Sequence, residues 1–207
     1  MNTRGLRAAA FVLIVLGLAS LFLRPTVREI VISKSSRTLT AYTMDGDVLG
    51  RFPIGLGRDP LGPKEREGDE RTPEGDYTVC FKNPESRFHL SLGLSYPNPV
   101  DAERGLAAGL IGEEEYRAIS EAYHRGEIPP WKTPLGGEIF IHGGLERYDA
   151  TAGCVAVHRV RGERPARLRY DDLSYGRSQE KGGQAEHDQH EGGGAEASSV
   201  HLHAQNM

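Results

Sequence analysis

"TAGCVAV", Thr151 to Val157, is a short stretch in which small, flexible residues lead to a cysteine and then into an apolar run. The apolar run predicts a buried strand that begins at Cys154. Upstream, "GGEIFIHGG" contains a second short apolar segment, 138–141, which ends in His142 and also predicts a buried strand. We expect the two strand ends to lie side by side, with a thiol and an imidazole on adjacent strands.

The pairing of Cys154 with His142 indicates nucleophilic catalysis. A thiol becomes a thiolate near neutral pH only beside a base or a positive charge, and a histidine is the usual partner. The small residues 151–153 let backbone N–H groups approach a substrate carbonyl as an oxyanion hole. A lone cysteine is also common as a small core residue, and a lone histidine as a structural one. Residue types and spacing alone therefore leave both interpretations open.

The segments upstream predict a mainly β domain. Runs rich in Val, Ile, Thr and Tyr predict strands at 28–33, 37–43 and 48–55, and Asp45-Gly46 predicts a hairpin turn between the last two. Two further strands are predicted by "DYTVCFKN" and "RFHLSLGLSYPN". In the first of these, Cys80 fits a buried core position better than a disulfide partner.

Between residues 101 and 126 the apolar period changes from that of a strand to that of a helix. The apolar residues at helical spacing are Ile111, Tyr116, Ile119 and Tyr123. We expect Asp101 to cap the N-terminus of this helix and Gly126 to end it. The sequence therefore predicts a mainly β (α+β) fold, a mixed β-sandwich or barrel with a helical insert.

A charged segment, 57–77, is rich in proline and glycine and has the period of neither a helix nor a strand. A segment of this length without regular structure is more often functional or locally disordered than neutral. We interpret its most charged part, "KEREGDER" at 64–71, as a mobile loop beside the cleft. Lys64 and Arg71 are candidates for binding substrate carboxylates, but a solvated surface is the default expectation for such a run.

The N-terminus carries an export signal. Arg4 and Arg7 precede an uncharged apolar run, 8–23, with no convincing cleavage site after it. We predict that residues 1–25 form an uncleaved signal anchor, with a cleaved signal peptide as the alternative. In both cases the arginines stay inside and the rest of the chain is exported. The expected location is the cell envelope, on the periplasmic or extracytoplasmic face, with the chain anchored in the cytoplasmic membrane.

Residues 158–207 differ in composition from the rest of the chain. They are dominated by Arg, Glu, Gly, Gln, Ser and His, with too few apolar residues to bury a face. We therefore expect a low-complexity, disordered tail. The whole chain has a formal net charge of -4, so no nucleic-acid partner is expected, because such binding needs a basic patch.

Four segments in this order resemble the L,D-transpeptidase (YkuD-type) catalytic domain family, especially its murein L,D-transpeptidase-like branch with a helical insert. They are "GLGRDPLGPKEREGDERTPEGDY", "NPESRFHLSLGLSYPNPVD", "GGEIFIHGG" and "TAGCVAV". Each segment alone is only suggestive, whereas all four in order are specific. The resemblance covers residues 28–157, which we take as the catalytic domain, and it implies an L,D-transpeptidase-like β-sandwich or barrel.

The resemblance also implies roles for individual residues. Cys154 matches the catalytic cysteine of the family, and His142 matches its catalytic histidine. The residues implied to shape the oxyanion hole or to orient the imidazole are Gly143, Gly153 and Thr151. Those implied to face the substrate are His89 and Gly144.

The reaction of this family is acyl transfer on peptidoglycan. The cysteine attacks a tetrapeptide stem, expels the terminal D-alanine and forms a thioester, which an amine on a neighbouring stem or on a protein then resolves. The resemblance implies a cysteine-dependent L,D-transpeptidase of cell wall biogenesis and cell shape, with peptidoglycan stem peptides as partners. It implies no organic cofactor and no metal. Hydrolysis, by an L,D-carboxypeptidase or an amidase, is an alternative in which water resolves the thioester.

Two departures from the family pattern bear on activity. Many members carry arginine two positions after the cysteine, where this chain has Ala156. The family also continues with an amphipathic helix and a closing strand, of which the composition after Val157 gives no sign. A reading-frame shift in the gene, or a natural replacement of the last elements, would explain the break. A missing closing strand would leave an exposed sheet edge, so an inactive wall-binding remnant is a third possibility.

Overall fold

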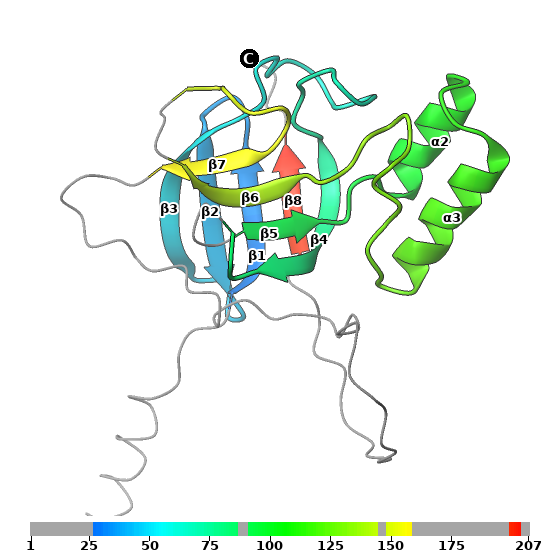
Figure 1. Cartoon of the computed structure of the whole chain (residues 1–207). Coiled ribbons are helices and arrows are strands. Elements are labelled where there is room, and N and C mark those ends of the chain that lie inside the picture. The colour runs from blue at the N-terminus through cyan, green and yellow to red at the C-terminus, as the bar shows by residue number, and fades with distance from the viewer. Residues whose placement is uncertain (1–26, 87–90, 145–147, 159–198, 204–207) are drawn as a thin grey trace, which may run out of the picture.

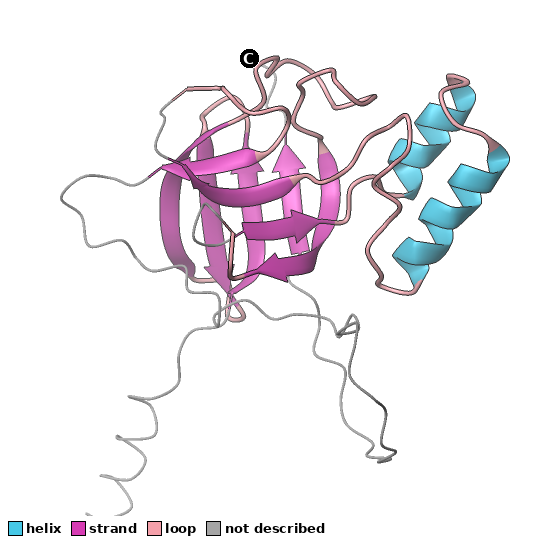
Figure 2. Cartoon of the chain, in the orientation of Figure 1, coloured by secondary structure: helices cyan, strands magenta, loops and turns pink. Residues whose placement is uncertain are grey.

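The computed structural model describes residues 27–86, 91–144, 148–158 and 199–203. Within these ranges the chain forms a closed barrel with two helices beside it (Figure 1, Figure 2). The strand order around the barrel is β1-β2-β3-β7-β6-β5-β4-β8. The mainly β fold with a helical insert is therefore confirmed. The predicted signal anchor at 1–25, His89 and residues 159–198 of the predicted tail lie outside the described residues.

The first three strands are consecutive neighbours in the barrel. They are β1 (Val27–Ser33), β2 (Thr38–Thr43) and β3 (Val48–Gly55), and each pairs antiparallel with the next. The turn between β2 and β3 contains Gly46 at φ +83°, a conformation that glycine adopts without strain. Ile30 and Ile32 in β1 are fully buried, as the period of two in a strand requires. The predicted hairpin is thus confirmed.

The other half of the barrel carries the residues implied in catalysis. β4 (Gly75–Asn83), β5 (Ser91–Leu94) and β6 (Phe140–Gly144) follow one another in antiparallel pairs. β6 then runs parallel to β7 (Val155–His158), which pairs antiparallel with β3. The two strands predicted from the short apolar segments therefore lie side by side. β6 begins later than expected and runs through His142 to Gly144.

The barrel is closed by β8 (Ser199–His203), which lies between β1 and β4. It pairs parallel with β1 and antiparallel with β4, and its Val200 is fully buried. The expectation of a disordered tail is therefore wrong for these five residues, and no exposed edge remains between β1 and β4. Composition averaged over the whole tail concealed the short alternating pattern "SVHLH", which a single strand needs.

The barrel interior holds one apolar cluster, drawn from all eight strands and from segments between them. Its fully buried members include Val27, Leu39, Leu56, Leu94, Tyr96, Val155 and Val200. Cys80, in β4, is only 4% exposed and forms no disulfide. Burial raises the pKa of its thiol to about 12, so this cysteine is an inert core residue. Its predicted core position is confirmed.

The helical insert consists of two helices, α2 (Pro99–Ala107) and α3 (Glu113–His124). The prediction of one helix across 101–126 is therefore wrong, because the chain turns at Gly109, which has φ +68°. The prediction of Asp101 as N-cap is also wrong. Asn98 caps α2 by accepting hydrogen bonds from the backbone N–H groups of Val100 and Asp101, and the Asp101 carboxylate accepts from the N–H of Asn98 in return.

The two helices lie beside the barrel and pack around a small apolar cluster of their own (Figure 2). Its buried members are Ala102, Ile111, Ile119 and Leu135. The Tyr77 hydroxyl in β4 donates to the Asp101 carboxylate at 3.0 Å, and the Tyr96 hydroxyl donates to the Leu135 carbonyl at 3.0 Å. These bonds fix the insert to the barrel. Within the described ranges, neither helix has the length and apolar character needed to cross a membrane.

Candidate active site

The parallel pairing of β6 with β7 brings His142 and Cys154 together. His142 lies opposite Ala156, and Ile141 lies opposite Val155, so that Cys154 directly precedes the paired residues. His142 shares a face of β6 with Phe140, whose backbone interacts with the Cys154 thiol. The backbone positions of His142 and Cys154 therefore lie near each other, at neighbouring ends of two paired strands.

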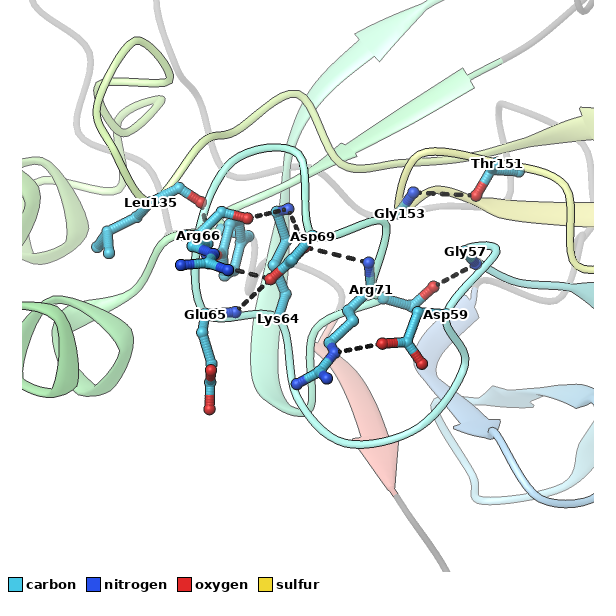
Figure 3. A network of polar contacts seen from close by, with 12 residues as sticks. Gly57, Asp59, Lys64, Glu65, Arg66, Asp69, Arg71, Leu135, Thr151 and Gly153 are labelled. Carbon is cyan, nitrogen blue, oxygen red and sulfur yellow. Dashed lines mark hydrogen bonds and ion pairs between the residues drawn. The ribbon is translucent and has the colours of Figure 1, made fainter. Parts of the chain in front are cut away.

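The turn before Cys154 is organised by the Thr151 side chain. Its hydroxyl accepts from the Gly153 N–H at 3.1 Å (Figure 3). It also donates to the Cys154 carbonyl at 2.7 Å. Gly153 has φ +136°, and a Cβ at this position would lie 2.8 Å from the Arg71 carbonyl oxygen. Because glycine alone tolerates both constraints, the small residues before the cysteine permit a tight turn against the neighbouring loop.

The Cys154 side chain is half-buried, and its Sγ–H donates to the backbone carbonyl of Glu138 at 3.6 Å. Burial raises the pKa of this thiol, and the nearby Glu138 carboxylate raises it further. A backbone bond from Phe140 and the charge of Lys64 act in the opposite direction. The thiol is therefore the favoured form in the unliganded site, and a base has to remove its proton before it can act as a nucleophile.

The His142 ring is oriented by its own strand. Nδ1 lies 2.9 Å from the carbonyl oxygen of Gly143. A carbonyl only accepts hydrogen bonds, so this contact assigns the ring proton to Nδ1 and the lone pair to Nε2 in the neutral imidazole. The orienting contact thus comes from Gly143, and Gly144 ends the same strand.

The loop before β4 contains a buried ion pair that the sequence did not predict. Lys64 is only 4% exposed, and its ammonium group donates to the Asp69 carboxylate at 2.8 Å (Figure 3). The other oxygen of Asp69 accepts from the N–H groups of Glu65 and Arg66 at 2.7 and 3.0 Å. Although burial opposes it, these bonds hold the pKa of Asp69 below its ordinary value. The expectation of a solvated Lys64 is therefore wrong.

Arg71, the other cation singled out in this loop, is paired with Asp59. Its Nε donates to Asp59 Oδ2 at 2.8 Å (Figure 3). The loop backbone is also bonded to the turn before Cys154, because the Arg58 N–H donates to the Thr151 carbonyl at 3.0 Å. The charged loop thus forms a wall of the candidate site, with its polar side chains bonded to one another.

Glu138 is a site residue that sequence reasoning missed. It adopts φ +54°, which is rare for a residue other than glycine. Backbone strain of this kind is concentrated at functional sites, and here it aims the Glu138 carbonyl at the Cys154 Sγ. The double glycine that precedes it in "GGEIFIHGG" is the sole sequence signal of an unusual backbone at this point.

The family model of the L,D-transpeptidase catalytic domain, YkuD, matches residues 27–164. This chain belongs to that family. Membership supports a peptidoglycan-modifying function for this L,D-transpeptidase domain and implies a location in the cell envelope. The match also extends through β7, which contains Ala156 in place of the arginine of many members.

Individual relatives agree with this assignment. The chain is 36% identical over 81 residues to the "Putative L,D-transpeptidase YafK" of Escherichia coli K12, which covers 37% of this chain and 33% of YafK. Its fold is similar to that of the helical cell shape determining protein Pgp2 (K307A mutant) from Campylobacter jejuni, with a TM-score of 0.50 and 20% identity. That similarity covers 90% of this chain and 50% of Pgp2. This chain thus covers about a third of the length of YafK and half of the length of Pgp2.

Proposed function

We propose that this protein is a cysteine-dependent L,D-transpeptidase in which Cys154 is the nucleophile and His142 the general base. The observation that carries the proposal is the arrangement of the two strand ends. The imidazole proton is held on Nδ1 by Gly143, on the strand that pairs with the one following Cys154. That tautomer leaves Nε2 with the lone pair that a general base needs.

The proposed acylation proceeds in two proton-coupled stages. His142 takes the Cys154 proton, and the thiolate attacks the carbonyl carbon of a peptide bond in a stem peptide. The carbon–nitrogen bond then breaks, the imidazolium returns its proton to the departing amine, and a thioester remains on Cys154. A neighbouring imidazolium also offsets the burial that raises the pKa of the free thiol.

The developing oxyanion needs backbone donors. The N–H of Gly153 is already bonded to Thr151, so we propose that Thr151 and Gly153 shape the turn and that the N–H of Cys154 itself faces the oxyanion. An oxyanion donor in a preorganised turn contributes about 2.7–4 kcal/mol to the transition state. His89 and Gly144 remain proposals as substrate-facing residues.

An amine acceptor, which completes transpeptidation, is the acceptor that we propose. The hydrolytic alternative uses the same thioester and differs only in that water resolves it. The inactive-remnant alternative was based on a missing closing helix and strand, and the pairing of β8 with both β1 and β4 argues against a missing strand. For the location, we propose export to the cell envelope with residues 1–25 as a signal anchor, supported by the apolar run at 8–23 after two arginines.

Intact-mass spectrometry with a disaccharide-tetrapeptide tests the mechanism. We expect an adduct equal to the substrate minus its terminal D-alanine on the wild-type protein and no adduct on Cys154→Ala. His142→Ala should reduce the rate of adduct formation by about 10²–10⁴-fold, the usual contribution of a general base.

The chain supplies a matched control, because Cys80 is its other cysteine. Cys80→Ala should form the adduct as the wild type does, since its thiol is buried in the core. Circular dichroism establishes that each variant is folded. Turnover of the tetrapeptide by folded Cys154→Ala would exclude the covalent mechanism.

A further inference from the structure

A pocket of about 540 Å³ adjoins the candidate active site. It is lined by Glu67 from the loop before β4 and by residues of the 131–138 segment, which connects the helical insert to β6. Glu138 belongs both to this lining and to the surroundings of Cys154, since its carbonyl accepts from the Cys154 Sγ. A ligand group in the pocket is therefore close to any acyl group on Cys154.

The two walls of the pocket are held together by direct contacts. The N–H of Glu67 donates to the Pro134 carbonyl at 2.9 Å. A Cβ on Gly136 would lie 3.3 Å from the Glu67 Cα, so the two segments are in van der Waals contact. The Lys64–Asp69 pair holds the loop on either side of Glu67. The pocket is thus preformed rather than assembled by the ligand.

The charges of the lining favour a cation. Glu67 and Glu138 are exposed carboxylates, whereas Lys132 is the one cationic side chain in the lining. The nearby ammonium of Lys64 is already paired with Asp69. The pocket therefore presents a net negative charge to a ligand, which attracts an ammonium group and repels a carboxylate.

The buried polar atoms of the lining distinguish this pocket from a chance group of acidic residues. Thr133 is only 7% exposed, and its hydroxyl has no hydrogen-bond partner among the described residues; the same is true of the buried Trp131 Nε1. Buried polar atoms in native proteins nearly always have partners, so a ligand or a water molecule is expected here.

We propose that this acidic pocket, formed by Glu67, Trp131, Lys132, Thr133 and Glu138, binds the protonated primary amine of the acceptor that resolves the Cys154 thioester. This proposal rests on the transpeptidase function proposed above. It assigns Glu67 and Glu138 as the residues that favour an amine over water at the second step.

The chemistry of that step balances without a further reactant. The bound ammonium first releases one proton to solvent. Its nitrogen then forms a bond to the thioester carbon, the carbon–sulfur bond breaks, and Cys154 departs as a thiolate. The second amine proton passes to His142 Nε2. The products are an amide and the free enzyme.

The position of Trp131 allows a direct binding test, because it is the single tryptophan of the chain. The probe is Nα-acetyl-lysine amide, titrated into the full chain while tryptophan fluorescence is followed. We expect a saturable change, and weaker or no binding of Nα-acetyl-norleucine amide, which has the same shape without the amine. Glu67→Gln and Glu138→Gln should each weaken binding by about two- to fivefold, the factor that one exposed charge pair supplies.

Two variants serve as controls. Glu114→Gln removes the same charge from the exposed surface of α3 and should leave binding unchanged. Lys132→Gln removes a like charge and should strengthen binding. Absence of a saturable change, equal binding of the norleucine compound, or unchanged affinity in both glutamate variants would overturn the proposal. The titration involves no thioester, so a failure of catalysis with binding intact counts against the proposed function alone.

Discussion

The surroundings of Cys154 act on the pKa of its thiol in opposite directions. Half-burial raises the pKa of the thiol, while His142, the residue that we propose as its base, lies on the neighbouring strand. The Thr151 hydroxyl holds the turn from both sides through its bonds to Gly153 and Cys154. Thr151 thus fixes the backbone that positions the Cys154 sulfur atom.

The raised pKa of Cys154 predicts how its reactivity depends on pH. Only the thiolate is alkylated, so iodoacetamide should modify Cys154 slowly at neutral pH and faster as pH rises through the raised pKa. Glu138→Gln removes a carboxylate that raises this pKa, so the midpoint should move to lower pH. Rates are measured by intact mass in the Cys80→Ala background, where Cys154 is the single thiol. A midpoint that does not move in the Glu138 variant would contradict the role of that carboxylate.

Among the elements, the loop before β4 departs most from what its composition suggests. A run of alternating charges between glycines and prolines is typical of a solvated surface, yet Lys64 and Asp69 form a pair with side chains only 3% and 9% exposed. The pair fixes a loop that contacts both the turn before Cys154 and the acidic pocket. Its order depends on internal hydrogen bonds rather than on regular secondary structure.

The Asp69 carboxylate should therefore support stability in a pH-dependent way. Its folded-state pKa is depressed, so its contribution is present above the pKa of the unfolded chain and is lost as pH falls through the depressed value. Asp69→Asn should lower the free energy of unfolding by about 3–5 kcal/mol near neutral pH, the cost of breaking a buried ion pair. The difference from wild type should shrink in acid.

Urea unfolding at several pH values measures this contribution. Asp45→Asn, at the exposed turn between β2 and β3, is the control for loss of an aspartate charge and should change stability by less than about 0.5 kcal/mol. An Asp69→Asn effect that is constant across the acid range would show that the carboxylate charge is not its source.

Elements defined by interactions between residues close in sequence could be predicted, whereas those defined by contacts between distant segments could not. Strands β1 to β3 and the turn at Gly46 were predictable, because alternation and turn residues are local signals. The cap of α2 was also encoded locally, in Asn98 followed by proline and an acidic third residue, although Asp101 was preferred instead. The break between α2 and α3 could have been inferred from the two glycines in the segment that joins them, Gly109 and Gly112.

The residues of the candidate site also divide into those predictable from local sequence and those that were not. Cys154 and His142 were recognisable from short motifs, because each motif combines a reactive side chain with adjacent small residues. The burial of Lys64 was not predictable, since its loop contacts residues 134–136, about 70 positions away in the sequence. The position of Glu138 was not predictable either, because it depends on a contact with Cys154 in another segment. Spacing within one segment does not report which loop packs against another.

For the molecule as a whole, β8 makes the barrel continuous. Val200 is fully buried between β1 and β4 although it is surrounded in sequence by a segment of low hydrophobicity. A short alternating run thus completes the core once two strand edges are available as templates.

Val200→Asp tests the contribution of β8. An unpaired carboxylate in the barrel interior should lower the free energy of unfolding by more than about 3 kcal/mol, among the largest effects of a single substitution. Val48→Asp provides the matched control, because Val48 is 47% exposed in β3 and the same change there should have a small effect. Thermal unfolding followed by circular dichroism compares the two. Equal stability of both variants would mean that β8 does not contribute to the folded barrel.

The pairing of β8 with β1 also bears on how the chain reaches its native state. Strand Val27–Ser33 acquires its parallel neighbour only from Ser199–His203, one of the longest sequence separations in the barrel. Contacts of such long range are slow to form, because the entropy of closing the loop is lost before the contact stabilises the chain. A nascent polypeptide that has emerged only as far as His158 would expose two unpaired backbone edges, which are prone to aggregation. β1 and β4 can pair with β8 only after the chain has been synthesised through residues 199–203. We therefore expect a chaperone that shields these edges until then to raise the yield of folded protein.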